Sequence, residues 1–327
     1  MPVKVTANPK FFCAVLCVFI FSFSLSDIYA EEAIRSQVQE DVIKEAMGEA
    51  SSISYRQQLG KPVVVQEEQF TQELDTYVRF MPLTGSDAQS GKIGLVTSAS
   101  EYNYQIKAFD KLPIEFAVIS KYIGINNSTA VKLPAKLTSV GFGAEATFPF
   151  FNLDKTYFTA GIAPAFFSDN WKFNSSTFSL QQRYFLIYQP NEKLTLVSGI
   201  EYSPGFRPSV SPLVGLIYRP NDRLTFNLIP DNPEISYDLN NKWTAFLQGN
   251  NTSEQYKVKQ GGLKNAVLNY EEMRLGAGLR CAADKHIKTS LSAGTVFNRS
   301  IKYKQDSLGK VAPNSGFYSE FRLDIVM

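Results

Sequence analysis

The sequence has few of the residues on which most metal and enzyme centres depend. It contains one histidine, His286, and three cysteines, of which Cys13 and Cys17 fall in an N-terminal segment that we expect to be removed. Cys281 then stands alone, which excludes an intramolecular disulfide and a cysteine metal cluster. No Gly-rich phosphate loop, zinc spacing or calcium loop occurs. We therefore expect no cofactor, no metal site and no enzymatic activity.

A bias in charge and a long apolar run are also missing. Lys and Arg number 33 against 31 Asp and Glu, for a net charge of +2, which does not favour a nucleic-acid partner. After residue 30, no uninterrupted apolar run approaches the roughly 18 residues of a transmembrane helix. What the chain does have is 25 Phe and 16 Tyr, which favour strands.

Residues 1–30 have the pattern of a secretory signal peptide. Lys4 and Lys10 precede the apolar stretch FFCAVLCVFIFSFSL, and Ala30 is a small residue at the expected cleavage point. The apolar stretch is shorter than the ~20 residues needed to span a bilayer, so a retained anchor is disfavoured. The prediction is export across the inner membrane of a Gram-negative bacterium.

Residues 31–70 differ from the rest of the chain. Ile34, Val38, Val42 and Ala46 recur every fourth residue, which indicates a weakly amphipathic helix in a polar context. We interpret this stretch as a periplasmic segment, partly helical or flexible. A segment that plugs the following domain is the alternative.

From residue 71 to 327 the apolar period changes to two. In MRLGAGLRCA, for example, Met273, Leu275 and Leu279 alternate with Arg274 and Arg280. Such runs are ten residues or longer and repeat many times, as in transmembrane barrel strands, which need about 9 to 11 residues of this pattern. The sequence predicts an all-β, antiparallel up-and-down barrel in the outer membrane, in contact with lipid and inserted by the barrel-assembly machinery.

One phrase occurs three times: YQPNEKLT at Tyr188, YRPNDRLT at Tyr218 and YDLNNKWT at Tyr237. Each places Asn in a short polar stretch between strand patterns, which is turn chemistry. With three looser relatives, six tight turns are predicted, near Asp110, Asp154, Glu192, Asp222, Asn241 and Asp284. Six hairpins plus one strand at each end give 14 strands. The other connections, among them GNNTSEQYKVKQGGLKN (residues 249–265), are expected to be longer loops on the outer side of the membrane, with the tight turns in the periplasm. The short runs LTFNLIP and EISYDL leave 12 as the alternative.

The signal peptide, the run YRPNDRLTFNLIPDNPEISYDLNNKW and the alternating aromatic C-terminus resemble an uncharacterised family of bacterial outer-membrane β-barrels, one of the domain-of-unknown-function families. The resemblance runs from about Gln72 to the end and implies the barrel architecture. It implies no catalytic residues. The last residue, Met327, departs from the Phe or Trp that usually ends such barrels.

The polar faces of the predicted strands carry charges of both signs. The side chains that we expect to face the lumen are Glu145, Arg183, Glu201, Arg274, Arg280, Lys288, Glu320 and Arg322. Mixed signs fit either paired side chains that fill the lumen or the lining of a weak, poorly selective pore. We therefore predict a pore or transporter for small molecules of unknown identity. A structural or interaction barrel with a filled lumen is the alternative, and a lipid-modifying enzyme is the weakest reading.

Overall fold

The computed structural model describes residues 70–327 apart from short gaps at 87–88, 109–111, 152, 172, 174, 205–208, 231, 261–262 and 306–307. The predicted signal peptide and all but the last residue of the predicted N-terminal segment lie outside the described residues. Within them, the one helical element is the short η1 (Ser175–Thr177), and no helix is long and apolar enough to cross a membrane.

The strands are β1 (Phe70–Ser86), β2 (Gln89–Ala108), β3 (Leu112–Asn127), β4 (Lys136–Pro149), β5 (Thr156–Ser168), β6 (Phe178–Asn191), β7 (Leu194–Tyr202), β8 (Val210–Asn221), β9 (Leu224–Asn227), β10 (Glu234–Asp238), β11 (Trp243–Gln260), β12 (Leu263–Ala282), β13 (Ile287–Tyr303), β14 (Lys310–Val311) and β15 (Gly316–Val326).

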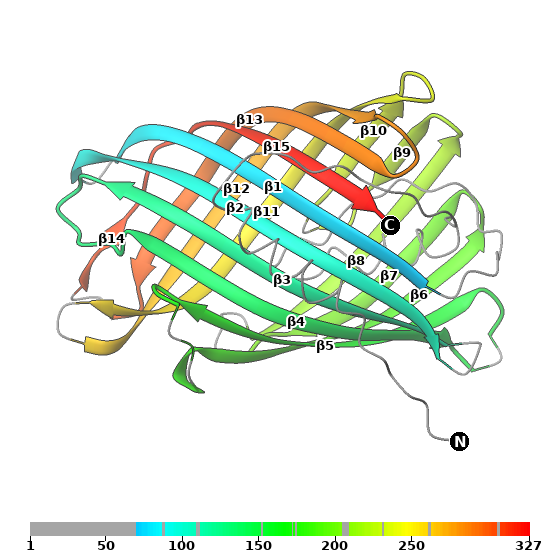
Figure 1. The fold of residues 1–327 in the computed structure, drawn as a ribbon, viewed down its shortest axis with the longest axis horizontal. Helices are drawn as coiled ribbons and strands as arrows, with labels where there is room; N and C mark the ends of the chain where they lie inside the picture. The colour runs from blue at the N-terminus through cyan, green and yellow to red at the C-terminus, as the bar shows by residue number, and fades with distance from the viewer. Residues whose placement is uncertain are drawn as a thin grey trace. The chain divides into compact units, whose positions relative to one another are not determined.

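These strands close into a barrel (Figure 1). Each of β1 to β13 pairs with its sequence neighbour, β13 pairs with β15, and β15 returns to pair antiparallel with β1. The wall therefore has 14 strands, because the two-residue β14 only extends β13 at its edge. The predicted architecture and the count of 14 are confirmed, and the alternative of 12 strands is wrong.

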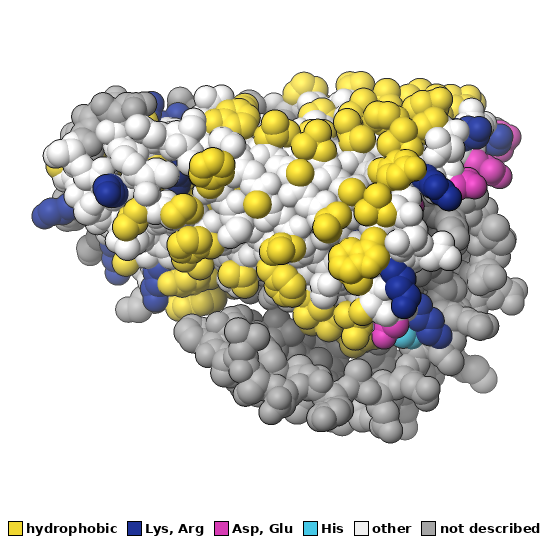
Figure 2. Space-filling view, turned by 90° about the horizontal axis from the view of Figure 1, so that it is seen from above, with side chains coloured by type: hydrophobic (Ala, Val, Ile, Leu, Met, Phe, Trp, Pro, Cys, Tyr) yellow, Lys and Arg dark blue, Asp and Glu magenta, His cyan; other side chains and the backbone are white. Residues whose placement is uncertain are grey.

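Alternation places apolar side chains on the outside of the wall. Leu275 is 51% exposed and Phe321 is 49% exposed, whereas their polar neighbours Arg274 and Glu320 are buried. Figure 2 shows apolar side chains spread over one face of the barrel, with charged side chains gathered toward its two ends. A closed antiparallel barrel with an apolar exterior is the form in which strands cross the bacterial outer membrane, because closure satisfies every strand edge in lipid. The protein is an outer-membrane β-barrel whose exterior contacts lipid.

The repeated phrase is a turn stabilised by its asparagine. The side-chain oxygens of Asn191, Asn221 and Asn240 each accept the backbone N–H of the residue two positions further on, at 2.9–3.0 Å. This contact is the Asx turn that Asn favours. The turns β2–β3, β4–β5, β6–β7, β8–β9, β10–β11 and β12–β13 all lie at one end of the barrel, which we name the tight-turn end. Tyr188 and Tyr218, each three residues before a turn asparagine, are exposed.

The other end, the loop end, differs from the sequence prediction at one connection. The segment GNNTSEQYKVKQGGLKN, residues 249–265, is predicted as a long loop, yet β11 continues to Gln260 and β12 begins at Leu263. This prediction is wrong because Thr252, Glu254 and Tyr256 alternate inward and are buried, so a polar composition here reflects two-faced strands. The longer connections at this end are residues 128–135, 169–177 and 203–209.

Strands β9 and β10 have only four and five residues, far fewer than the neighbouring β8 and β11. Their connection, residues 228–233, turns inward, so that Ile229 is completely buried against β8. A Cβ on Gly215 of β8 would lie 2.8 Å from the Ile229 Cα, so glycine permits this approach. The connection thus fills part of the interior beside β8.

Candidate functional site

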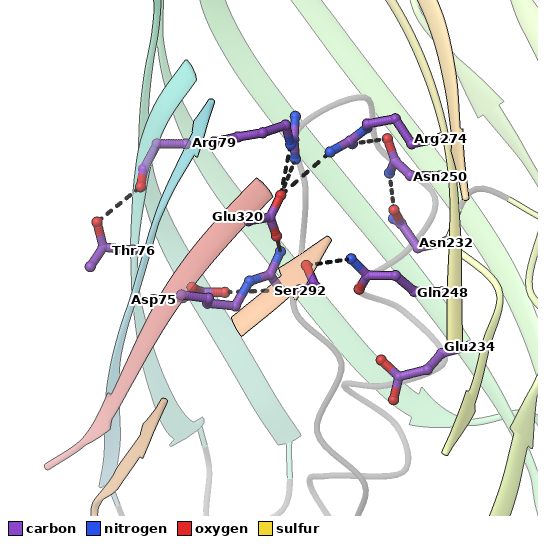
Figure 3. A network of polar contacts seen from close by, with 12 residues as sticks. Asp75, Thr76, Arg79, Asn232, Glu234, Gln248, Asn250, Arg274, Ser292 and Glu320 are labelled. Carbon is purple, nitrogen blue, oxygen red and sulfur yellow. Dashed lines mark hydrogen bonds and ion pairs between the residues drawn. The ribbon is translucent and has the colours of Figure 1, made fainter. Parts of the chain in front are cut away.

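A network of arginines and carboxylates joins β1, β12 and β15 on the inner side of the wall (Figure 3). Arg79 lies opposite Glu320 in register, and its Nε and Nη2 atoms lie 2.7 and 2.6 Å from one Glu320 carboxylate oxygen. Arg274 of β12 reaches the same oxygen at 3.4 Å and Glu272 at 3.2 Å. All four side chains are buried, and a buried charge is stable only when such partners compensate it.

Arg322 extends this network toward the tight-turn end. Its guanidinium lies 3.4 Å from Glu320 and 3.7 Å from Asp75 of β1. In the other direction Arg274 donates to the Asn250 side chain, which donates to Asn232 in the β9–β10 connection. The arginine–carboxylate network, as we name it, consists of Asp75, Arg79, Glu272, Arg274, Glu320 and Arg322. Three positive charges meet three negative charges in it.

A second ion pair connects strands that are not neighbours in the wall. The Lys121 ammonium of β3 lies 2.6 Å from the Glu254 carboxylate of β11. The Tyr256 hydroxyl donates to the other Glu254 oxygen at 2.6 Å. Because β3 and β11 belong to different parts of the wall, this pair spans the interior and narrows it.

Nearer the loop end the interior is apolar. Ile93, Ile123, Leu137, Phe167 and Leu268 come from five different strands and are each 2% exposed or less. They belong to one contiguous cluster, which we name the loop-end cluster. Aliphatic and aromatic side chains that interdigitate at this burial leave little room for water.

Two non-neighbouring strands meet directly beside this cluster. The rings of Phe167 on β5 and Tyr256 on β11 pack edge to face with centroids 5.7 Å apart. The Asp169 backbone N–H donates to the Lys257 carbonyl at 3.3 Å, and the Lys259 N–H donates to the Asp169 carboxylate at 2.9 Å. The wall is therefore drawn together at this level, and strands β6 to β10 lie on one side of the contact.

The structure gives partners to most of the predicted lumen residues. Glu145 and Arg183 form one ion pair, and Arg280 lies 3.0 Å from Glu234. Arg274, Glu320 and Arg322 belong to the arginine–carboxylate network. Glu201 accepts a hydrogen bond from Ser203 at 2.9 Å, and Lys288 lies opposite Asp324 in register. These contacts do not test whether the side chains line a passage, so that role stays a prediction.

Sequence reasoning missed several members of the buried polar interior, among them Asp75, Arg79, Glu254 and Glu272. The signal was present in β1, where Glu73, Asp75, Tyr77 and Arg79 alternate with Leu74, Thr76, Val78 and Phe80. The partners could not be identified, because Arg79 and Glu320 are 241 positions apart.

The described residues include the histidine, His286, and the carboxylates that bear on metal or acid–base chemistry. No group of three or more His, Cys, Asp or Glu among them could hold a metal ion. His286 lies in the β12–β13 turn, where its Nδ1 is 3.1 Å from the Val326 carbonyl oxygen. In the same turn the backbone N–H groups of His286 and Ile287 donate to Asp284, at 2.7 and 2.8 Å, and lower the pKa of that carboxyl.

Residues 114–324 match the family model described as Domain of unknown function (DUF6268). The match covers most of the barrel and well over half of the chain, so the protein belongs to this family. Its sequence matches no curated protein.

Several solved structures resemble the barrel. One is a FadL homologue from Pseudomonas aeruginosa, 10% identical, with a TM-score of 0.43 over 79% of this chain and 90% of that one. Another is an outer-membrane channel from Pseudomonas putida F1, 10% identical, with a TM-score of 0.44 over 80% and 97%. A third is the toluene transporter TodX of Pseudomonas putida, 8% identical, with a TM-score of 0.38 over 80% and 89%. Likeness at this level concerns barrel architecture and transfers neither ligand nor activity.

Proposed function

We propose that this protein is a low-conductance barrel for the passage of small molecules across the outer membrane. The observation that carries the proposal is the division of the interior into a charged, hydrogen-bonding part toward the tight-turn end and an apolar part toward the loop end. A uniformly apolar interior would suffice to fill a barrel. Burying a charged side chain costs desolvation free energy. In membrane proteins, ionisable side chains within the membrane commonly mark the pathway of a substrate or ion.

Size supports a narrow passage. A barrel of 14 strands lies between eight-stranded barrels, which side chains fill, and porins of 16 or more, which hold an aqueous channel. Here Lys121–Glu254 and Phe167–Tyr256 connect separate parts of the wall and reduce the space further. We therefore expect weak conductance with little preference between simple cations and anions in the resting state. Neither an enzymatic reaction nor a cofactor belongs to the proposed function, and insertion by the barrel-assembly machinery is part of it.

The same contacts favour one alternative, a structural or interaction barrel whose lumen is permanently filled. The two functions differ in whether the loop-end cluster can be opened. Phe167→Ala removes a fully buried ring at the contact between β5 and β11. Val78→Ala, on the exposed face of β1, is the matched truncation outside the interior.

The experiment measures single-channel currents of residues 31–327 in planar bilayers. The proposed function predicts small, infrequent currents in the wild type and larger or more frequent ones in Phe167→Ala, with Val78→Ala unchanged. The absence of current in all three proteins would support the structural barrel with a permanently filled lumen instead. Large, steady currents in the wild type would contradict the closure by the loop-end cluster.

A further inference from the structure

Strand β2 presents three successive inward-facing side chains with buried oxygen atoms that lack full hydrogen bonding. They are Glu101, Asn103 and Gln105, each at most 7% exposed. Both carboxylate oxygens of Glu101 and the side-chain carbonyl oxygens of Asn103 and Gln105 are buried and accept no hydrogen bond within bonding geometry from the described residues. The Asn103 amide lies close enough to interact with the Glu101 carboxylate, but it is one donor beside several acceptors. Buried polar atoms are nearly always hydrogen-bonded, so three adjacent exceptions require an explanation.

The neighbouring strands do not supply the missing donors. Glu101 lies opposite Asp75 of β1 on one side and Ile119 of β3 on the other. Asp75 carries a like charge, and Ile119 has no polar group. Asn103 lies opposite Ala117, and Gln105 lies opposite Glu115.

The nearby cations are shared with other carboxylates, and one of them, Arg183, also interacts electrostatically with Glu101. Arg322 lies against Asp75 and Glu320, and Arg183 forms an ion pair with Glu145. The inner side of β1 to β3 at this level therefore offers acceptors and negative charge in excess of donors. An isolated carboxylate in such a place is unstable without a counter-charge.

We propose that Glu101, Asn103 and Gln105 form a binding site for a small organic cation that carries N–H donors, such as an alkylammonium or a guanidinium group. An ammonium offers three donors and a guanidinium five, which complements a carboxylate beside amide oxygens. The described residues contain no group of three or more His, Cys, Asp or Glu that could hold a metal ion, and an N–H donor satisfies the unpaired acceptor oxygens directly. The name β2 acceptor strip denotes these three residues below.

As a statement about what passes through the barrel, the proposal rests on the proposed function. Binding itself does not, because it is measured on residues 31–327 in detergent without any current. A protein that binds the cation but does not conduct would support the binding site and refute the proposed transport function. A protein that conducts but does not bind would do the reverse.

The experiment compares three probe cations by isothermal titration calorimetry: guanidinium, methylammonium and tetramethylammonium. The last has the same charge and no N–H donor. The site predicts binding of the first two and not of the third. Glu101→Gln should weaken guanidinium binding by about tenfold or more, since hydrogen bonds to charged groups contribute about 1.5–3 kcal/mol.

Glu271→Gln is the matched control, because it removes the same charge from a half-exposed pair with Lys302 nearer the loop end. A second variant, Asn103→Asp, adds a negative charge to the β2 acceptor strip and should tighten guanidinium binding. It keeps the proposal testable if Glu101→Gln folds poorly. Equal binding of all three cations, equal effects of the two Glu variants, or no binding to the wild type would each overturn the site.

Discussion

Glu320 holds the arginine–carboxylate network together, and its replacement by Gln tests whether the interior is dry. The Glu320 carboxylate lies within 3.4 Å of Arg79, Arg274 and Arg322. Without its charge, three arginines share only Glu272 and Asp75, and Arg79 keeps a single carboxylate at 3.8 Å. Removing one partner of a buried ion pair costs about 3–5 kcal/mol, and we expect about 3 kcal/mol here because the amide oxygen still accepts a hydrogen bond.

The assay is urea unfolding of the barrel in lipid vesicles, followed by tryptophan fluorescence. Ser319→Ala, one residue away on the exposed face of β15, is the control and should change the free energy of unfolding by less than about 0.5 kcal/mol. The double variant Arg79→Met with Glu320→Leu restores charge balance. It should cost less than Glu320→Gln alone, because apolar replacements of a whole buried pair are often neutral.

A small effect would refute the reasoning. If Glu320→Gln costs less than about 1 kcal/mol, the charges behave as surface pairs in contact with water. The network would then be the lining of a hydrated lumen, and the low-conductance proposal would lose its basis. A double variant that is less stable than the single one would show that packing, and not charge balance, sets the stability at this site.

The remaining predictions concern facing, topology and pH. Leu279→Arg should cost about 2–4 kcal/mol if it lies near the bilayer midplane, and loss of the heat-resistant folded band on gels would report it. Arg280→Leu should also be costly, since it leaves buried Glu234 without its ion pair. Because such barrels have short periplasmic turns and longer outer loops, a tag at Lys132 in a loop-end connection should be labelled on intact cells and one at Asp222 in a tight turn should not. The opposite pattern would reverse this topology. Asp284 has a lowered pKa, so its stabilisation is present above the ordinary value of 3.8 and is lost as pH falls through the lower folded value. Asp284→Asn should therefore be less stable than the wild type at pH 7 and equal to it in strong acid, in parallel unfolding curves.

The sequence by itself determined the barrel, the number of its strands and the position of its tight turns. These features depend on local patterns. A period of two assigns each side chain to one face of a strand, and Asn191, Asn221 and Asn240 stabilise their turns through backbone groups two residues away. Closure follows, because in lipid a strand edge cannot remain unpaired.

Only the tertiary structure decided which inward side chains meet. Lys121 finds Glu254 and Phe167 finds Tyr256 between strands that are distant in the sequence, so no local pattern can pair them. The same reason explains the misjudged segment 249–265, whose polar residues pack against the far wall. It also explains why the sequence did not reveal the β2 acceptor strip. Glu101 stands out because the residues opposite it, Asp75 and Ile119, donate no hydrogen bond to it, and those neighbours are known only from the strand pairing.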